Sequence, residues 1–163
     1  MSIDFEEQYD KIYRYCYFRL RNRQTAEDIT QEAFLHYLEK YQCATAEAAL
    51  KCLYTIARNL CIDEYRRRAA EPLQTAEGSQ EKGAESGQIQ ETPKEEQILT
   101  SLAVRAAVAK LERDEQELLL LRYVNEVPIL TIGQLLGISR FAVYRRLMAA
   151  TKKLKHELKK EGF

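Results

Sequence analysis

Residues 26–38, AEDITQEAFLHYL, carry side chains suited to binding a positively charged partner. On a helix of about 3.6 residues per turn, the polar side would carry Asp28, Gln31, Glu32, Leu35 and Glu39, with no lysine or arginine. Asp28 and Glu32 would repel each other by roughly 0.2–0.5 kcal/mol in an isolated helix. A solvated face, the alternative, usually mixes both signs of charge. An acidic outer side that also contains a leucine therefore indicates a binding surface.

The segment 131–147, TIGQLLGISRFAVYRRL, has the pattern of a helix-turn-helix. Gly133 would lie where two helices approach closely, and Gly137 would take the left-handed turn that glycine adopts most easily. Ser139 would cap the second helix, whose accessible side would carry Arg140, Tyr144, Arg145 and Arg146. Arginine can bind a guanine edge through two hydrogen bonds in the major groove.

Lysines further along the same helix suit DNA phosphates, namely Lys152, Lys153 and Lys155. A helical hairpin with a glycine turn also occurs in bundles that never touch DNA, which is the alternative. The basic C-terminal segment favours DNA binding: residues 98–163 hold 12 basic and 7 acidic residues, whereas residues 69–97 hold 2 basic and 7 acidic ones. The formal net charge of zero arises because an acidic segment, 69–97, cancels a basic one, 98–163. Such asymmetry points to a nucleic-acid partner.

The sequence offers no catalytic or metal-binding constellation. Its four cysteines form no CxxC pair, and its two histidines, His36 and His156, have no cysteine or histidine at ligand spacing. There is no nucleophile–base pair and no glycine-rich phosphate loop, so we expect no enzyme, no metal and no cofactor. No apolar run approaches the ~18 residues that span a bilayer. We therefore expect no membrane insertion, a cytoplasmic location and free thiols.

Helical periodicity predicts an all-α protein with two small domains. Residues 1–68 would form a three-helix bundle, with one helix starting at a capping box of Asp4 and Glu7, a second over about 25–41 capped by Thr25, and a third over about 46–68. Residues 69–94 would form a flexible acidic linker. Residues 95–163 would form a four-helix domain that contains the helix-turn-helix. The predicted apolar side of the second helix comprises Ala26, Ile29, Ala33, Phe34, Tyr37 and Leu38.

Three segments, taken in order, resemble one family. AEDITQEAF is similar to the "AED-hydrophobic-x-QE-x-F" signature of the extracytoplasmic-function (ECF) group of bacterial sigma-70 family sigma factors. LYTIARNLCIDEYRRR resembles the next segment of that group. LERDEQELLLLRYV with TIGQLLGISRFAVYRRL resembles the second sigma domain, which binds the −35 promoter element. The resemblance covers most of the chain.

The resemblance implies partners and residues for three surfaces. Core RNA polymerase would be bound by Asp28, Gln31, Glu32 and Leu35, and the −10 element by Asn59, Arg58, Arg66 and Arg67. Asn59 could instead cap or brace the bundle. The −35 element would be bound by Arg140, Phe141, Tyr144, Arg145, Arg146, Lys152 and Lys153.

Two departures from the family lie in the first domain. The loop that reads the flipped −10 base would fall at about residues 41–50 and lacks the usual Phe and Gly. Cys52 stands where the family usually has Trp.

The function implied is that of an ECF sigma factor, which directs core polymerase to specific promoters and aids initiation without catalysis of its own. The resemblance also implies an anti-sigma factor as a partner. The alternative is a stand-alone helix-turn-helix regulator that binds DNA without polymerase. Such regulators usually dimerise on paired half-sites, and this alternative leaves the acidic helix unexplained.

Overall fold

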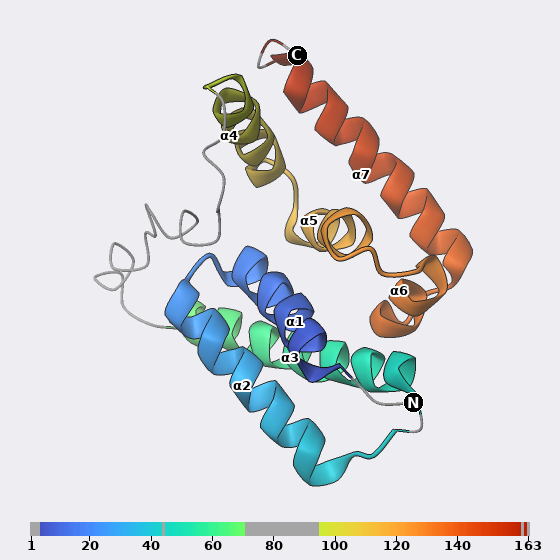
Figure 1. Cartoon of the computed structure of the whole chain (residues 1–163). Helices are drawn as coiled ribbons and strands as arrows, with labels where there is room; N and C mark the ends of the chain where they lie inside the picture. The colour runs from blue at the N-terminus through green and yellow to red at the C-terminus, as the bar shows by residue number, and fades with distance from the viewer. Residues whose placement is uncertain (1–3, 44, 71–94, 161, 163) are drawn as a thin grey trace. The chain divides into compact units, whose positions relative to one another are not determined.

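The computed structural model describes residues 4–43, 45–70, 95–160 and 162. The chain divides into two compact units, Met1–Ser86 and Gly87–Phe163 (Figure 1). Within the described ranges all regular structure is helical, so the predicted all-α fold is confirmed. The predicted linker, 69–94, lies outside the described residues except for Ala69 and Ala70, which still belong to the third helix.

The first unit is a bundle of three helices, each of which packs against the other two. They are α1 (Phe5–Leu20), α2 (Arg23–Lys40) and α3 (Ala46–Ala70). The predicted cap of α1 is present, because the Asp4 side chain accepts a hydrogen bond from the Glu7 backbone N–H at 3.1 Å.

The predicted start of α2 at Thr25 is wrong. Arg21 takes a left-handed conformation, with φ of 57°, and its N–H bonds back to the carbonyl of Tyr17 to end α1. Asn22 follows at once and caps α2 by accepting a hydrogen bond from the Thr25 N–H at 2.9 Å. The connection is therefore only two residues long, and Thr25 lies inside the first turn.

Four fully buried alanines contribute to the core of this bundle. Ala26 and Ala33 of α2 and Ala49 and Ala57 of α3 have no exposed surface, so the helices can approach closely. Buried aromatic side chains also belong to this core, as in the edge-to-face pair of Tyr15 and Tyr54, whose ring centroids are 5.7 Å apart. At its edge, the half-buried Phe34 contacts the rings of the half-buried Tyr9 and the exposed Phe5.

The predicted apolar side of α2 is correct except at one end. Ala26, Ile29, Ala33 and Tyr37 are buried, and Phe34 is half-buried. Leu38, however, is 60% exposed. Leu38 lies at the edge of the predicted apolar side, where α1 and α3 do not cover it, so the buried part of this side ends before Leu38.

The second unit contains α4 (Glu95–Ala109), α5 (Arg113–Leu119), α6 (Ile129–Leu136) and α7 (Arg140–Lys160). This matches the four predicted helices. The long helix α7 packs against α4, α5 and α6. Its buried residues are Val143, Leu147 and Ala150, which meet a core from the other helices that includes Ala107, Leu118, Leu121 and Ile132.

A π-helical turn, Leu120–Val124, continues α5 and was not predicted. The Asn125 N–H bonds to the Leu120 carbonyl at 3.0 Å, which closes the wider turn. Leu120 and Leu121 stay buried, whereas Tyr123 is 60% exposed. The turn therefore rotates an aromatic side chain out of an otherwise apolar run.

The helix-turn-helix prediction is confirmed in its details. A methyl group added to Gly133 would lie 2.8 Å from the backbone oxygen of Ile138, so the tight contact is with the turn itself. Gly137 has a φ of 72°. The Ser139 hydroxyl accepts a hydrogen bond from the Ala142 N–H at 3.1 Å and thus caps α7.

Replacing Gly133 by alanine should destabilise the second unit by about 1–3 kcal/mol, because the new methyl group must displace the Ile138 carbonyl. The measurement is urea-induced unfolding of the full chain, followed by far-ultraviolet circular dichroism. Gly137→Asn serves as the control, since no atom lies within 4 Å of a side chain there and asparagine tolerates a left-handed conformation. An unchanged unfolding free energy for Gly133→Ala would contradict the tight contact.

Candidate functional site

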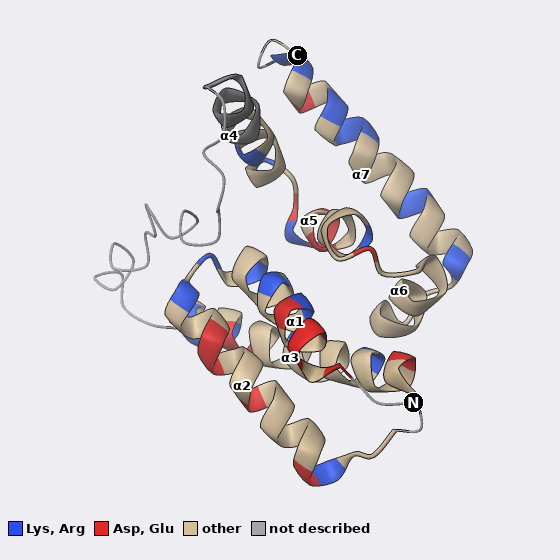
Figure 2. Cartoon of the chain, viewed as in Figure 1, with Lys and Arg blue, Asp and Glu red and all other residues tan. Residues whose placement is uncertain are grey.

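The outer side of α2 presents the predicted acidic surface. We call Asp28, Gln31, Glu32 and Leu35 the acidic face; all four side chains are exposed, and Leu35 is 58% exposed. They lie opposite the buried residues of the same helix. Figure 2 shows red bands along α2 and basic residues only at its two ends.

Among the described residues, no lysine or arginine forms an ion pair with Asp28 or Glu32. The described ion pairs of Glu32 comprise a 3.7 Å contact with His36 Nε2, and the carboxylate of Asp28 accepts a long hydrogen bond, 3.5 Å, from the Gln24 amide. Histidine carries a full charge only when protonated. The two carboxylates therefore keep their charge available for a basic partner.

The outer side of α3 carries the residues predicted for DNA. Asn59 and Arg66 are exposed and lie seven residues apart, about 10 Å along one face. The Asn59 side chain makes no hydrogen bond to another described residue, which argues against a role in bracing the bundle. Arg58 is half-buried on a neighbouring line of the helix.

The Arg67 guanidinium forms an ion pair with Glu64 of the same helix, whereas no such pair with Glu64 is described for Arg66. The Glu64 carboxylate contacts the Arg67 guanidinium at 2.6 Å and that of Arg68 at 3.1 Å. The hydrogen bond from Arg67 lowers the pKa of Glu64, burial opposes this shift, and Arg68 adds to the lowering. Arg68 also donates to the Leu20 carbonyl at 3.2 Å and so ties α3 to α1. Arg66 is therefore the freest of the three cations for a phosphate.

The exposed side of α7 begins with the predicted recognition residues. Arg140, Tyr144, Arg145 and Arg146 are all exposed, and the Arg140 guanidinium lies 5.7 Å from the ring centre of Phe141. Phe141 and Met148 are 70% and 71% exposed. This surface combines cations with large apolar groups.

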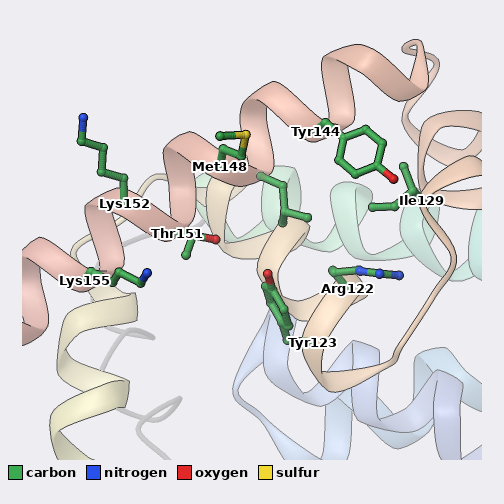
Figure 3. A pocket seen from close by; sticks show the side chains of 9 residues that line it. Arg122, Tyr123, Ile129, Tyr144, Met148, Thr151, Lys152 and Lys155 are labelled. Carbon is green, nitrogen blue, oxygen red and sulfur yellow. The ribbon is translucent and has the colours of Figure 1, made fainter.

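A groove of about 490 Å³ runs beside this side of α7 (Figure 3). Its lining combines apolar and cationic side chains from three segments, including Arg122, Tyr123, Ile129, Tyr144, Met148 and Lys155. Sequence reasoning missed Tyr123 and Met148. The run of leucines before Tyr123 suggests a continuous buried stripe, and only the π-helical turn brings that ring to the surface.

Two of the three lysines predicted to bind phosphates, Lys152 and Lys153, are in different environments. Lys152 is exposed and lines the groove. Lys153 forms an ion pair with Glu115 of α5, with 2.5 Å between nitrogen and oxygen. The hydrogen bond from Lys153 lowers the pKa of Glu115 against the effect of burial, and the same contact raises the pKa of Lys153. Lys153 thus braces α7 against α5.

The described part of the chain holds no group of three or more residues placed to bind a metal ion. All four cysteines are free thiols. None of the described helices has the length and apolarity that would let it span a membrane.

Comparisons with known proteins match both units. Residues 5–71 match the family model described as Sigma-70 region 2, and residues 101–154 match that of Sigma-70, region 4. The ECF RNA polymerase sigma factor SigW of Bacillus subtilis is 29% identical over 157 residues, which cover 92% of this chain and 84% of SigW.

Two further proteins extend the comparison. The ECF RNA polymerase sigma factor BldN of Streptomyces coelicolor is 28% identical over 144 residues, 85% of this chain, and this chain spans about half (53%) of the length of BldN. The sigma factor RpoE of Bartonella quintana, solved with the anti-sigma factor NepR, aligns with a TM-score of 0.68 at 18% identity and covers 93% of this chain and 92% of RpoE. At that identity the likeness shows the fold alone.

Glu64→Gln should destabilise the first unit by about 0.5–1 kcal/mol at pH 7, because the carboxylate loses its charge opposite two arginines. Since the folded-state pKa of Glu64 lies below its ordinary value of 4.5, this stabilisation is present above that value and is lost as the pH falls through the folded pKa. The measurement is urea-induced unfolding of both proteins between pH 7 and pH 3. Asp63→Asn, at an exposed neighbour, is the control. A difference that persisted unchanged at pH 3 would contradict the charge-based explanation.

Proposed function

The chain belongs to the sigma-70 family, in its ECF group, and we propose that it acts as an RNA polymerase sigma factor that directs core polymerase to specific promoters and aids initiation. The observation that supports this function most directly is the order of the two family matches. Region 2 and region 4 fall on separate helical units, with α1–α3 in the first and the helix-turn-helix in the second.

Within this function, residues 1–68 would bind polymerase and the −10 element, residues 95–163 would bind the −35 element, and residues 69–94 would link the two. The acidic face is the proposed polymerase-binding surface. Carboxylates that meet arginines form short, charge-assisted hydrogen bonds. Leu35, 58% exposed in the free chain, would add apolar burial at the centre of the contact.

The proposed −10 surface consists of Asn59, Arg58, Arg66 and Arg67, and Arg66 is the member with the freest cation. Single-stranded DNA is held by stacking and by basic grooves, which the outer side of α3 could begin to form. For the −35 element we propose Arg140, Phe141, Tyr144, Arg145, Arg146, Lys152 and Lys153. Lys153 would serve mainly by holding α7 in place through Glu115.

Sigma-70 family members are generally non-enzymatic initiation factors, and we propose that this chain likewise catalyses nothing itself. It would work in the cytoplasm, where polymerase and promoter DNA are found. The RpoE structure contains the anti-sigma factor NepR, and an anti-sigma factor is a proposed partner of this chain as well.

Glu32→Arg should abolish co-elution of the chain with bacterial core RNA polymerase in size-exclusion chromatography, because it places a cation against a basic partner. Asp10→Arg, which makes the same charge change at an exposed position of α1, should leave co-elution intact.

Three outcomes separate the possibilities. If Glu32→Arg abolishes co-elution and Asp10→Arg does not, the result supports both the sigma function and the acidic face as the polymerase-binding surface. Co-elution of both variants would remove the acidic face from the interface. Failure of the wild-type chain to co-elute while it still binds DNA would favour the stand-alone helix-turn-helix regulator.

Arg145→Ala should weaken binding of the reconstituted holoenzyme to promoter DNA by about tenfold or more, since an arginine bound to guanine through two hydrogen bonds is worth about 1–3 kcal/mol. The measurement is a fluorescence-anisotropy titration on a fragment that the wild-type holoenzyme selects from genomic DNA. Lys159→Ala, near the exposed end of α7, is the control and should change affinity little. Equal affinities of wild type and Arg145→Ala would contradict the assignment.

A further inference from the structure

The second half of α1 and the connection to α2 are rich in aromatic and basic side chains. Residues 11–23 hold one lysine, four arginines and four aromatic residues, with no aspartate or glutamate. Figure 2 shows basic residues at the connection between the two helices and at the start of α2. Tyr15 belongs to the core, whereas Tyr13, Tyr17 and Phe18 are only half-buried. This composition indicates a surface for a ligand that is both anionic and aromatic.

Three rings and two arginines follow one another on the outer side of α1. The rings of Tyr13 and Tyr17 are stacked, with centroids 6.2 Å apart, and Phe18 meets Tyr17 edge to face at 5.5 Å. The Arg21 guanidinium lies 5.4 Å from the centre of the Phe18 ring. Arg14 and Arg21 are exposed. We call Tyr13, Arg14, Tyr17, Phe18 and Arg21 the aromatic–arginine face, which covers about 12 Å along the helix.

Contacts between α1 and α3 place this face beside the end of α3. The Tyr65 hydroxyl donates a hydrogen bond to the Arg19 carbonyl, and the Arg68 guanidinium donates to the Leu20 carbonyl at 3.2 Å. The Arg19 guanidinium also lies 5.3 Å from the centre of the Tyr65 ring. Arg66 follows Tyr65 directly in the chain. The aromatic–arginine face therefore borders the arginines that end α3.

The residues proposed above for the −10 element supply cations and an amide but no ring. Single-stranded DNA is held by a positively charged groove together with aromatic side chains that stack on the bases. The chain has no tryptophan, and Cys52 stands where the sigma family usually has one. The aromatic–arginine face has both the rings and the cations that unpaired DNA requires.

We propose that the aromatic–arginine face of α1 binds unpaired DNA, as a stacking platform for bases of the opened strand next to those held by α3. The rings stack on bases, and Arg14 and Arg21 bind the phosphates between them. Bases in a duplex present only their edges in the grooves, so a row of rings favours single-stranded over double-stranded DNA. Because the strand becomes unpaired during promoter opening, this role rests on the proposed sigma function.

The first test measures the affinity of the full chain for single-stranded DNA and does not depend on the sigma function. The probe is a fluorescein-labelled oligothymidylate of about 16 nucleotides, long enough for one single-strand site, titrated by fluorescence anisotropy. Phe18→Leu keeps an apolar side chain and removes the ring. It should weaken binding about fivefold or more, as expected for the loss of one stacked base. Phe34→Leu, which removes a half-buried ring of α2, is the control and should bind like the wild type.

Both variants should keep the circular dichroism of the wild type. Their affinity for a duplex of the same length should also be unchanged, because the platform takes unpaired bases.

A second variant, Arg21→Asn, tests the contribution of charge. Asparagine tolerates the left-handed conformation at this position, so the variant keeps the turn between α1 and α2. The slope of log affinity against log salt concentration should become shallower by about 0.7, the value for one phosphate contact on a single strand. Lys51→Gln, which removes an exposed cation near the start of α3, should leave the slope unchanged.

Ultraviolet cross-linking then places the base on the chain. A strand that contains 5-iododeoxyuridine cross-links to aromatic side chains that stack on the modified base. The label should appear on tryptic peptide 15–19, YCYFR, which contains Tyr17 and Phe18.

Four results would overturn the proposal. They are no binding of oligothymidylate by the wild-type chain, equal affinities of Phe18→Leu and Phe34→Leu, an equal loss of single-strand and duplex binding in Phe18→Leu, and cross-links confined to residues 95–163.

Co-elution with core polymerase separates this site from the sigma function. A wild-type chain that fails to co-elute, while Phe18→Leu loses single-strand affinity, would overturn the sigma function and leave the single-strand site standing. Co-elution of the wild type, with equal single-strand affinities of wild type and Phe18→Leu, would overturn the site and leave the sigma function standing.

Discussion

Close packing of alanines is the constraint on which the N-terminal bundle depends. Ala26 and Ala33 occupy the inner side of α2, and the distance between packed helices is set by the side chains at their contact. A larger residue there would push α2 away from α1 and α3. Because only the side of α2 with Ala26 and Ala33 can pack closely against α1 and α3, the rotation of α2 about its own axis is fixed. The carboxylates of Asp28 and Glu32 must then point outward, so the external charge pattern follows from the small residues inside.

Helical periodicity alone was enough to predict the all-α fold and the exposure of the acidic face, since burial of one side of a helix requires exposure of the other. The start of α2 was harder to predict. Asn22 and Thr25 are both good capping residues, and the choice between them depends on the left-handed conformation of Arg21, which arginine rarely adopts. Leu38 shows the same difficulty, because a residue at the edge of an apolar side is buried only if a neighbouring helix reaches it.

Contacts between residues distant in sequence could not be predicted at all. The ion pair of Lys153 with Glu115 forms only when α7 packs against α5. The exposure of Tyr123 depends on the π-helical turn Leu120–Val124. The spacing of the leucines before it does not predict this turn. The residues proposed to contact polymerase and promoter are harder to predict, because the charges and shape of the partner help to select them. The residue pattern predicts an acidic surface and a basic helix-turn-helix, whereas the identity of polymerase and of the −10 and −35 elements as partners comes from resemblance to a family.

Each unit closes its own core with its own helices, and this separation bears on how such a chain can evolve. A substitution that loosens α6 or α7 lowers the stability of the second unit and leaves the alanine packing of the first unit untouched. The two halves can therefore accumulate substitutions at different rates. Under the proposed function, a lineage could change the promoter preference of the second unit while the first unit keeps its polymerase-binding surface, so that duplicated copies of one chain could come to control different genes.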